Sequence, residues 1–271
     1  MRILVKVGGA QLEQAPARAS LVRSVARARA AGHEVVLVHG GGNQIRDLSR
    51  RLGLADRYHE GLRITDAATA DVVLMVLAGL VNKTLVAALE RGGVRCCGLS
   101  GADGSSFSAR RITRPGVDLG FVGEIERVDA QLVETLLDAG YTPVIATSAP
   151  ESVGTASDAV PTDSHFANVN ADVAAGPLAR ALEVDALLFL TDVLGVLDAD
   201  GGLIAALSPA AAAGLRASGV IHGGMIPKVD AALGALAAHP EALVKIAPAA
   251  GGDAVLSALA AHTGTRFEVE A

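Results

Sequence analysis

The sequence predicts an α/β fold, a three-layer αβα sandwich around an open and mainly parallel central sheet. Apolar strand segments alternate with segments of helical periodicity along the 271 residues, an order that is typical of parallel sheets. The composition is 51% hydrophobic but only 3% aromatic. Alanine, valine and leucine must therefore fill the core, as they do where helices cover both faces of a parallel sheet. The length fits two lobes that share one continuous sheet.

The individual elements follow from apolar runs and from the glycines, prolines and caps between them. Residues 148–166 are rich in serine, proline, threonine and glycine and predict a long loop or an irregular hairpin. We place the boundary between an N-terminal lobe, 1–166, and a C-terminal lobe, 167–271, directly after it. The expected strands are 3–7, 34–38, 94–99, two short ones between 107 and 128, 142–147, 186–191, 243–246 and 266–269; the expected helices are 16–31, 43–52, one from about 66 to 91, 130–139, 171–182, 208–217, 229–238 and 253–262.

The composition also argues against several classes of function. A formal net charge of −6 disfavours nucleic acid as a partner. Cys96 and Cys97 are adjacent, which fits neither a disulfide framework nor a metal site, so a reducing cytoplasm is the natural setting. No signal-peptide pattern precedes the first strand. The apolar run 72–81 is too short to span a bilayer, and we expect a buried helix there and no membrane partner.

Two glycine-rich segments predict anion sites. Lys6 lies in a buried strand, where it costs desolvation free energy unless an anion meets it, and Gly8 and Gly9 let backbone N–H groups approach a ligand closely. The alternative is an edge-strand lysine that reaches solvent before an ordinary turn. The glycines 40–42 follow another strand and open into a helix, whose dipole favours anions. His39 precedes them, but a lone histidine is more often structural and we assign it no catalytic role.

Six short motifs resemble those of one enzyme family. The sequence contains no P-loop, no dinucleotide-binding glycine fingerprint and no protein-kinase HRD signature. Six other segments occur in the order and context of the acetylglutamate kinases, members of the amino acid kinase superfamily, and the resemblance covers essentially the whole chain. They are KVGG (6–9), VHGGG (38–42), GLRIT (61–65), NVNAD (168–172), TDVLG (191–195) and GGMIPK (223–228), and GTR (264–266) is similar to the family's C-terminal end.

The resemblance implies the amino acid kinase fold and transfer of the γ-phosphoryl group of ATP to the side-chain carboxylate of N-acetyl-L-glutamate, a step of arginine biosynthesis. A carboxylate is already ionised at neutral pH, so the reaction needs charge neutralisation and positioning rather than a base. Lys6 and Lys228 resemble the two lysines that flank the transferring group, and Asp172 resembles the carboxylate that holds both. An exposed lysine at a helix start and a carboxylate that complements a helix dipole are the structural alternatives.

The resemblance also implies binding roles for other residues. Arg63 would meet the substrate's α-carboxylate, and Asn168 and Asn170 its acylamino group, although an asparagine also caps helices well. The N-terminal lobe would bind the amino acid and dimerise, and the C-terminal lobe would bind ATP, with Mg²⁺ held by phosphate oxygens and water and not by protein side chains. Gly8, Gly9, Gly41 and Gly42 would offer N–H groups to the γ-phosphate and the accepting carboxylate, and Asp192, Val193, Gly195, Met225 and Ile226 would line the nucleotide pocket.

Two other functions stay open at this point. The segment 148–166 is longer than expected in this family, and related kinases act on glutamate or aminoadipate whose amino group is blocked by a carrier protein. Arg110, Arg111 and Arg114 would serve such an acidic partner, and solvated arginines explain them equally well. The second alternative is a non-catalytic amino-acid or nucleotide sensor, which would not need both lysines. The N-terminal helix of arginine-inhibited hexameric members is missing, so we predict a homodimer without that feedback.

Overall fold

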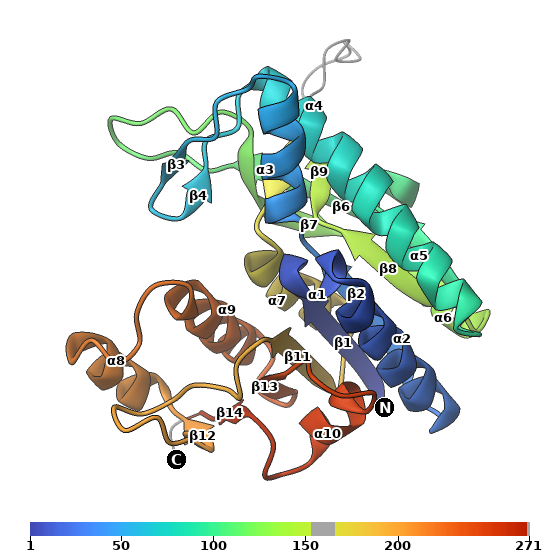
Figure 1. Ribbon diagram of the computed structural model, residues 1–271, viewed down its shortest axis with the longest axis vertical. Coiled ribbons are helices and arrows are strands. Elements are labelled where there is room, and N and C mark those ends of the chain that lie inside the picture. Colours follow the sequence, from blue (N-terminus) through green and yellow to red (C-terminus); the bar gives the residue numbers. More distant parts are fainter. Residues whose placement is uncertain (153–165, 270–271) are drawn as a thin grey trace.

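Eight strands form the central sheet of the computed structural model, which describes residues 1–152 and 166–269. Their order is β12-β14-β13-β11-β1-β2-β8-β5, and every pair is parallel except β13 with β14. Because β1 pairs with both β11 and β2, one continuous sheet joins the two halves of the chain (Figure 1). The strands are β1 (Arg2–Val7), β2 (Glu34–His39), β5 (Cys96–Leu99), β8 (Thr142–Ala146), β11 (Ala186–Thr191), β12 (Ala206–Leu207), β13 (Leu243–Pro248) and β14 (Thr265–Phe267).

Helices cover both faces of this sheet, which confirms the predicted αβα sandwich (Figure 1). Buried residues of α7 and α9 belong to the core on one face, and those of α2, α5 and α10 to the core on the other. The helices are α1 (Gly9–Glu13), α2 (Ala15–Ala30), α3 (Gly42–Arg51), α4 (Ala67–Leu74), α5 (Asn82–Arg91), α6 (Gln131–Asp138), α7 (Ala171–Ala181), α8 (Pro209–Ala217), α9 (Met225–Ala238) and α10 (Ala254–Leu259).

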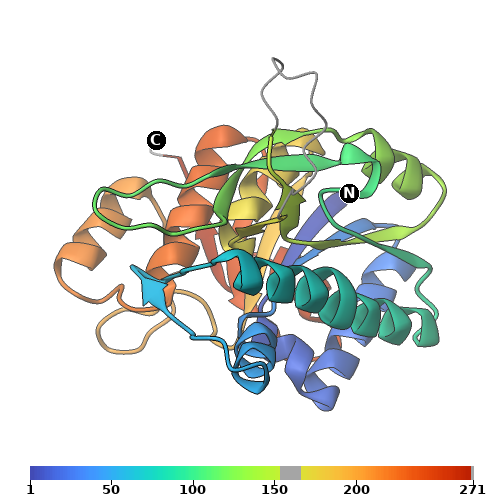
Figure 2. The same cartoon turned by 90° about the horizontal axis from the view of Figure 1, so that it is seen from above.

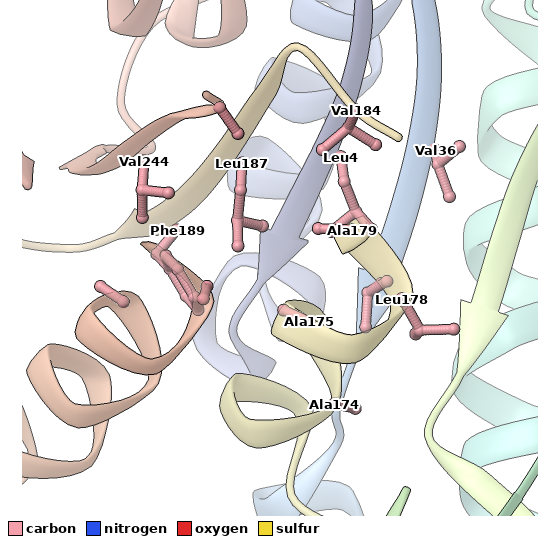
Figure 3. Close-up of a cluster of buried hydrophobic side chains, with 14 of the residues drawn as sticks. Leu4, Val36, Ala174, Ala175, Leu178, Ala179, Val184, Leu187, Phe189 and Val244 are labelled. Carbon is pink, nitrogen blue, oxygen red and sulfur yellow. The ribbon is translucent and has the colours of Figure 1, made fainter. Parts of the chain in front are cut away.

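The strand β1 divides its side chains between the two cores. Successive residues of a strand point to opposite faces, and Ile3 and Val5 accordingly pack in the core with α2, whereas Leu4 packs in the core with α7. Figure 3 shows Leu4 beside Ala179 of α7, with Ala175 farther along the same helix. The same alternation directs Lys6, two residues after Leu4, toward the face that α7 covers.

Small residues allow the helices on this face to pack closely. A side chain at Gly176 of α7 would come within 3.3 Å of the Cβ atom of Ala235 on α9. This close approach explains how a core with few aromatic residues can be filled. It also brings the N-terminal turn of α9, with Lys228, to the N-terminal turn of α7, with Asp172.

A second sheet and a hairpin lie outside the expected alternation. The second sheet has the order β6-β7-β10-β9, and two of its strands, β9 (Ser148–Pro150) and β10 (Phe166–Val169), flank the predicted irregular hairpin as an antiparallel pair. The middle of that predicted segment, 153–165, lies outside the described residues. The other strands are β6 (Phe107–Arg111) and β7 (Val122–Val128), and a hairpin of β3 (Tyr58–His59) and β4 (Leu62–Arg63), which was not predicted, precedes α4.

The expectation for the apolar run 72–81 was partly wrong. The helix that contains it is continuous over Ala67–Arg91 (Figure 2). These 25 residues are long and apolar enough to cross a membrane by length and composition, and 44% of the most apolar 18-residue stretch is buried. Val73 and Leu77 pack in the core, while Met75 and Leu80 are exposed. The segment Met75–Val81 is π-helical and joins α4 to α5. We assign this helix to the core layer, with one apolar side left open.

Candidate active site

Three charged residues from three elements meet at the carboxyl end of β1. The Nζ atom of Lys6 lies 2.6 Å from Oδ1 of Asp172, and the Nζ atom of Lys228 lies 3.2 Å from Oδ2 of the same carboxylate. Lys6 and Asp172 are buried, and Lys228 is less so. The structure thus brings together the three residues that the sequence singled out, with the carboxylate between the two lysines.

The local structure explains why the carboxylate and the second lysine are there. Asn170 caps α7, because its side chain accepts a hydrogen bond from the backbone N–H of Asp172 at 2.8 Å, and Asp172 in the first turn complements the helix dipole. The helix α9 begins at Met225 and not at 229 as expected, so Lys228 lies inside its first turn. A cation there opposes the dipole. Asp172 offsets that unfavourable position.

The charges of the site perturb one another. Burial lowers the pKa of Lys6 to about 8, with Asp172 opposing and Lys228 reinforcing this change. Burial alone would raise the pKa of Asp172, but the attraction of Lys6 and Lys228 lowers it below the ordinary value. At neutral pH Lys6 therefore keeps its positive charge and Asp172 its negative charge. With the formal charges of Lys6, Lys228 and Asp172 the site is net positive, which suits an anionic ligand.

A cavity of about 330 Å³ opens beside Lys6. The carboxyl ends of β1 and β2, the hairpin β3–β4 and the segment before α7 all contribute to its wall. In a parallel sheet these carboxyl ends meet at one edge, which is where ligands bind in α/β proteins. Of the predicted residues, Lys6, Gly8, Gly9, Gly41, Gly42, Arg63, Asn168 and Asn170 line this cavity.

Room for a side chain differs along the two glycine segments: Gly8 and Gly41 have close neighbours, whereas a Cβ atom at Gly42 would meet nothing within 4 Å. A Cβ atom at Gly41 would lie 2.8 Å from Leu77, and a Cβ atom at Gly8 would lie 2.8 Å from the side-chain oxygen of Gln11. The side-chain oxygen of Gln44 would lie 3.5 Å from a Cβ atom at either Gly9 or Gly41, so this amide sits between the two segments. A side chain at Gly41 would therefore displace its neighbours on the helix. The helix α1 after Gly8 was not predicted, and α3 begins at Gly42.

Arg63 is held firmly at the wall of the cavity. Its guanidinium group donates one hydrogen bond to the carbonyl oxygen of Gly42 at 2.8 Å and another to the carboxylate of Asp56, and it lies 4.8 Å from the ring centre of Tyr58. Burial, with Arg46 adding to it, lowers the pKa of Arg63 to about 10. The group stays charged at neutral pH. A fixed guanidinium fork of this kind suits a carboxylate.

The two asparagines have different local roles. Asn168 lies on β10 and donates a hydrogen bond to the hydroxyl of Thr65 at 3.2 Å. Asn170 is the cap of α7, which was the alternative to a binding role in the sequence analysis, and it also lines the cavity. Asn170 is therefore both a helix cap and a residue of the cavity wall, and the hydrogen bond of the cap fixes the orientation of its side chain.

The five predicted nucleotide residues lie apart from this cavity. Asp192, Val193 and Gly195 belong to the loop after β11, and Met225 and Ile226 start α9. Gly195 has no room for a side chain, because a Cβ atom there would lie 2.7 Å from the hydroxyl oxygen of Thr265. None of the five is among the residues that line the cavity of about 330 Å³.

The three arginines considered for an acidic partner already have acidic neighbours. Arg110 lies 2.6 Å from Glu124, Arg111 forms an ion pair with Glu151, and Arg114 lies 3.8 Å from Glu60. Arg111 also stacks over the ring of Phe121 at 3.9 Å. Because each arginine is already paired within the chain, the structure favours ordinary solvated surface arginines over a binding site for an acidic partner.

Sequence reasoning missed several residues of the cavity. Arg46 and Tyr58 line it, and Asp56 forms ion pairs with both Arg46 and Arg63. Leu77 of the π-helical segment lines it too. A local signal existed only for Tyr58, an aromatic residue a few positions before Arg63; nothing in the pattern around the others distinguishes them from ordinary surface or core positions.

Comparison with known proteins gives a consistent result. The model of the amino acid kinase family matches residues 1–245. The acetylglutamate kinase of Methanopyrus kandleri is 43% identical over 236 residues, which are 84% of this chain and 88% of that protein. The acetylglutamate kinase of Acidiphilium cryptum is 42% identical over 244 residues, 86% and 78% of the two chains. Among solved structures, smu.665 from Streptococcus mutans has a TM-score of 0.80 at 27% identity over 98% of both chains.

Proposed function

The chain belongs to the amino acid kinase family, and from that premise we propose that it is an acetylglutamate kinase. It transfers the γ-phosphoryl group of ATP to the side-chain carboxylate of N-acetyl-L-glutamate, a step of arginine biosynthesis. The observation that carries the proposal is the ion-paired group of Lys6, Asp172 and Lys228 beside a cavity lined by glycines and Arg63. Relatives at about 42% identity over most of the chain support it.

The reaction needs no base in this site. The accepting carboxylate is ionised at neutral pH, and the difficulty is to bring it against the negatively charged γ-phosphate. Lys6 and Lys228 offset that repulsion from two sides, and the negative charge that moves to the leaving oxygen in the transition state is stabilised by the same ammonium groups. A preorganised group of this kind contributes about 3 kcal/mol or more to transition-state stabilisation. Asp172 keeps both lysines in place before the substrates bind.

The cavity supplies contacts for an acylated dicarboxylic amino acid. Arg63 binds the α-carboxylate, Asn168 and Asn170 bind the acylamino group, and the N–H groups of Gly41 and Gly42 bind the accepting carboxylate. An unblocked amino group would bring a positive charge toward a site that already holds two lysines and an arginine. This charge distribution favours the acetylated substrate over free glutamate.

ATP enters from the C-terminal lobe in this proposal. Gly8 and Gly9 bind the γ-phosphate, and the ribose and adenine lie along Asp192, Val193, Gly195, Met225 and Ile226. Among the described residues no group of three histidine, cysteine, aspartate or glutamate side chains can hold a metal ion. Mg²⁺ would arrive with ATP, held by phosphate oxygens and water, and would shield the charge of the phosphates.

We also propose how the chain is organised. The N-terminal lobe, 1–166, binds the amino acid and forms a homodimer, the C-terminal lobe, 167–271, binds ATP, and the enzyme works in the cytoplasm. In the reaction the two lobes close on bound ATP, which excludes water from the reacting groups. Sedimentation of the purified protein distinguishes a dimer from a hexamer directly.

Trapping of the acyl phosphate with hydroxylamine tests the function. Purified protein is incubated with Mg-ATP and, separately, with N-acetylglutamate, glutamate, aspartate and aminoadipate. We expect hydroxamate with N-acetylglutamate alone. The matched variant Lys228→Ala should form none while it still binds nucleotide in part, and undiminished turnover in that variant would overturn the phosphoryl-transfer assignment.

The same experiment separates the alternatives. A protein that binds ATP but forms no hydroxamate from any free acid would be a carrier-linked kinase or a sensor. The variant Arg110→Glu separates a carrier-linked kinase from an enzyme that acts on a free acid, because it weakens a reaction with an acidic carrier protein and leaves a free small-molecule reaction nearly unchanged. The existing ion pair of Arg110 with Glu124 makes the carrier-linked reaction the weaker candidate.

A further inference from the structure

His39 has a buried hydrogen-bond partner on each side of its ring. Its Nδ1 atom lies 3.1 Å from the carbonyl oxygen of Gly40, the first residue of the glycine segment, and its Nε2 atom lies 3.0 Å from the side-chain nitrogen of Asn82. Both His39 and Asn82 are wholly buried. The proposed reaction gives neither residue a role, although the ring directly contacts the loop that lines the cavity.

The surrounding contacts fix the direction of the Asn82 amide. The Nζ atom of Lys83, which can only donate, lies 3.1 Å from Oδ1 of Asn82, so the oxygen is on that side. The amide nitrogen is then on the other side, where it donates to the carbonyl oxygen of Val144 at 2.8 Å and to the ring of His39. Asn82 is therefore a donor toward Nε2.

One protonation state of the ring satisfies all of these contacts. Because Asn82 donates to Nε2, that nitrogen must be unprotonated, and the ring proton must be on Nδ1, where it donates to the carbonyl of Gly40. Burial lowers the pKa of His39 to about 4, with the contact to Gly40 opposing and Lys83 reinforcing this change. The ring is neutral at pH 7.

The helix that carries Asn82 also packs directly against the glycine segment. Asn82 directly follows the π-helical segment Met75–Val81, and such segments often occur at functional sites. A Cβ atom at Gly41 would lie 2.8 Å from Leu77 and 3.1 Å from Val81 of that segment. The loop thus rests on the helix through van der Waals contact and is tied to it through His39.

We propose that His39 and Asn82 are positioning residues that aim the backbone N–H of the glycine segment at the reacting anions. In a trans peptide the carbonyl of one residue and the N–H of the next point in opposite directions. When His39 holds the carbonyl of Gly40, the N–H of Gly41 is turned away from the ring and toward the cavity that Gly41 lines. This inference rests on the proposed role of the cavity in phosphoryl transfer.

Kinetics of matched variants tests the positioning role. His39→Leu and Asn82→Leu should each lower kcat about 10- to 100-fold, because a misplaced donor loses transition-state contact, with KM for ATP within twofold. His39→Asn should have a higher rate than His39→Leu and come close to the wild-type rate. The amide nitrogen of asparagine is bonded to Cγ, as Nδ1 of histidine is, and can donate to the same carbonyl. His239→Leu is the control, because His239 also bonds a backbone carbonyl, that of Val184 at 3.0 Å, but lies outside the cavity. We expect it to change kcat less than twofold.

A direct measurement of the ring keeps the test independent of folding in the variants. In the wild-type protein, ¹⁵N NMR of the ring, assigned with His39→Asn, should show a proton on Nδ1 and an unprotonated Nε2 at pH 7. A proton on Nε2, or equal rates for His39→Asn and His39→Leu, would overturn the inference. Failure of the proposed function is a separate result, since wild-type protein would then form no hydroxamate.

Discussion

The site around Lys6 and the proposed nucleotide side differ in how far their side chains are buried and paired before any ligand binds. Lys6 is only 5% exposed and is ion-paired to Asp172. On the other side Leu194 is 60% exposed and Ile226 is 38% exposed, both apolar and open to solvent. The site around Lys6 is thus preorganised by charge, whereas the proposed nucleotide side presents apolar surface that a bound base and lobe closure would cover.

This difference predicts that substitutions on the two sides act on different quantities. At the buried site, removal of one charge leaves another uncompensated, and both stability and turnover suffer. At the open side, a truncated side chain loses only its contact with the nucleotide, and the affinity for ATP changes alone. Variants from both regions, compared in one set of measurements, test whether the two regions differ in this way.

The largest effect is expected at Asp172. Asp172→Ala leaves Lys6 buried without its partner, which costs about 3–5 kcal/mol of unfolding free energy, and kcat should fall on the order of 10³-fold because the lysines lose their positions. The double variant Lys6→Met/Asp172→Leu removes both charges and should recover much of the stability, measured by urea unfolding, with no activity. A double variant as unstable as the single one would contradict the view that the buried ion pair organises this region.

Arg63 should give the next largest effect, limited to the amino-acid substrate. Arg63→Lys removes the guanidinium fork that contacts Gly42 and Asp56, and KM for N-acetylglutamate should rise about 10- to 100-fold with KM for ATP unchanged. Arg216→Lys is the control, since Arg216 is ion-paired with Asp230 in the other lobe. An equal change in KM for ATP would mean that the cavity and the nucleotide side are not separate.

The sequence was sufficient where the chemistry is local and insufficient where it depends on distant partners. A lysine in an apolar strand that leads directly into Gly8 and Gly9 is an unusual combination, and Lys6 could be identified from it without a structure. The partners of His39 could not, because Asn82 is 43 residues away and looks like an ordinary polar residue of a helix. Sequence reasoning gave His39 no catalytic role, and the structure shows contacts that suggest a positioning role instead.

The fold divides in the same way. Long apolar strands such as β1 and β11 are recognisable in the sequence as continuous apolar runs, so the αβα sandwich was predicted correctly. The second sheet was predicted only in part: β6 and β7 were expected, but β9 and β10 are short and flank a segment rich in turn residues, and their pairing is decided by tertiary contacts. The early start of α9 was missed because Pro227 favours the first turn of a helix, a signal that the glycines before it obscured.

The pH dependence of the reaction should report on the buried site. In the proposed mechanism protonated Lys6 is the active form. With its pKa lowered to about 8, its charge is fully present below about pH 7 and is lost as the pH rises through 8. We expect kcat/KM, which reports on the free enzyme, to fall about tenfold per pH unit above 8. The fall in kcat should begin at higher pH, because the bound phosphates stabilise the ammonium. Profiles that are flat to pH 10 would mean that Lys6 is not poised in this way.

The smallest effect is expected at the open nucleotide side. Ile226→Ala removes apolar contact from a side chain that is already partly exposed, so KM for ATP should rise only about 3- to 10-fold, with kcat and KM for N-acetylglutamate nearly unchanged. Leu52→Ala is the control, an exposed leucine at the end of α3 that lies outside the cavity. If Ile226→Ala instead lowered kcat as strongly as a change at Lys6, the nucleotide side would be part of the preorganised site, and the contrast between the two regions would not hold.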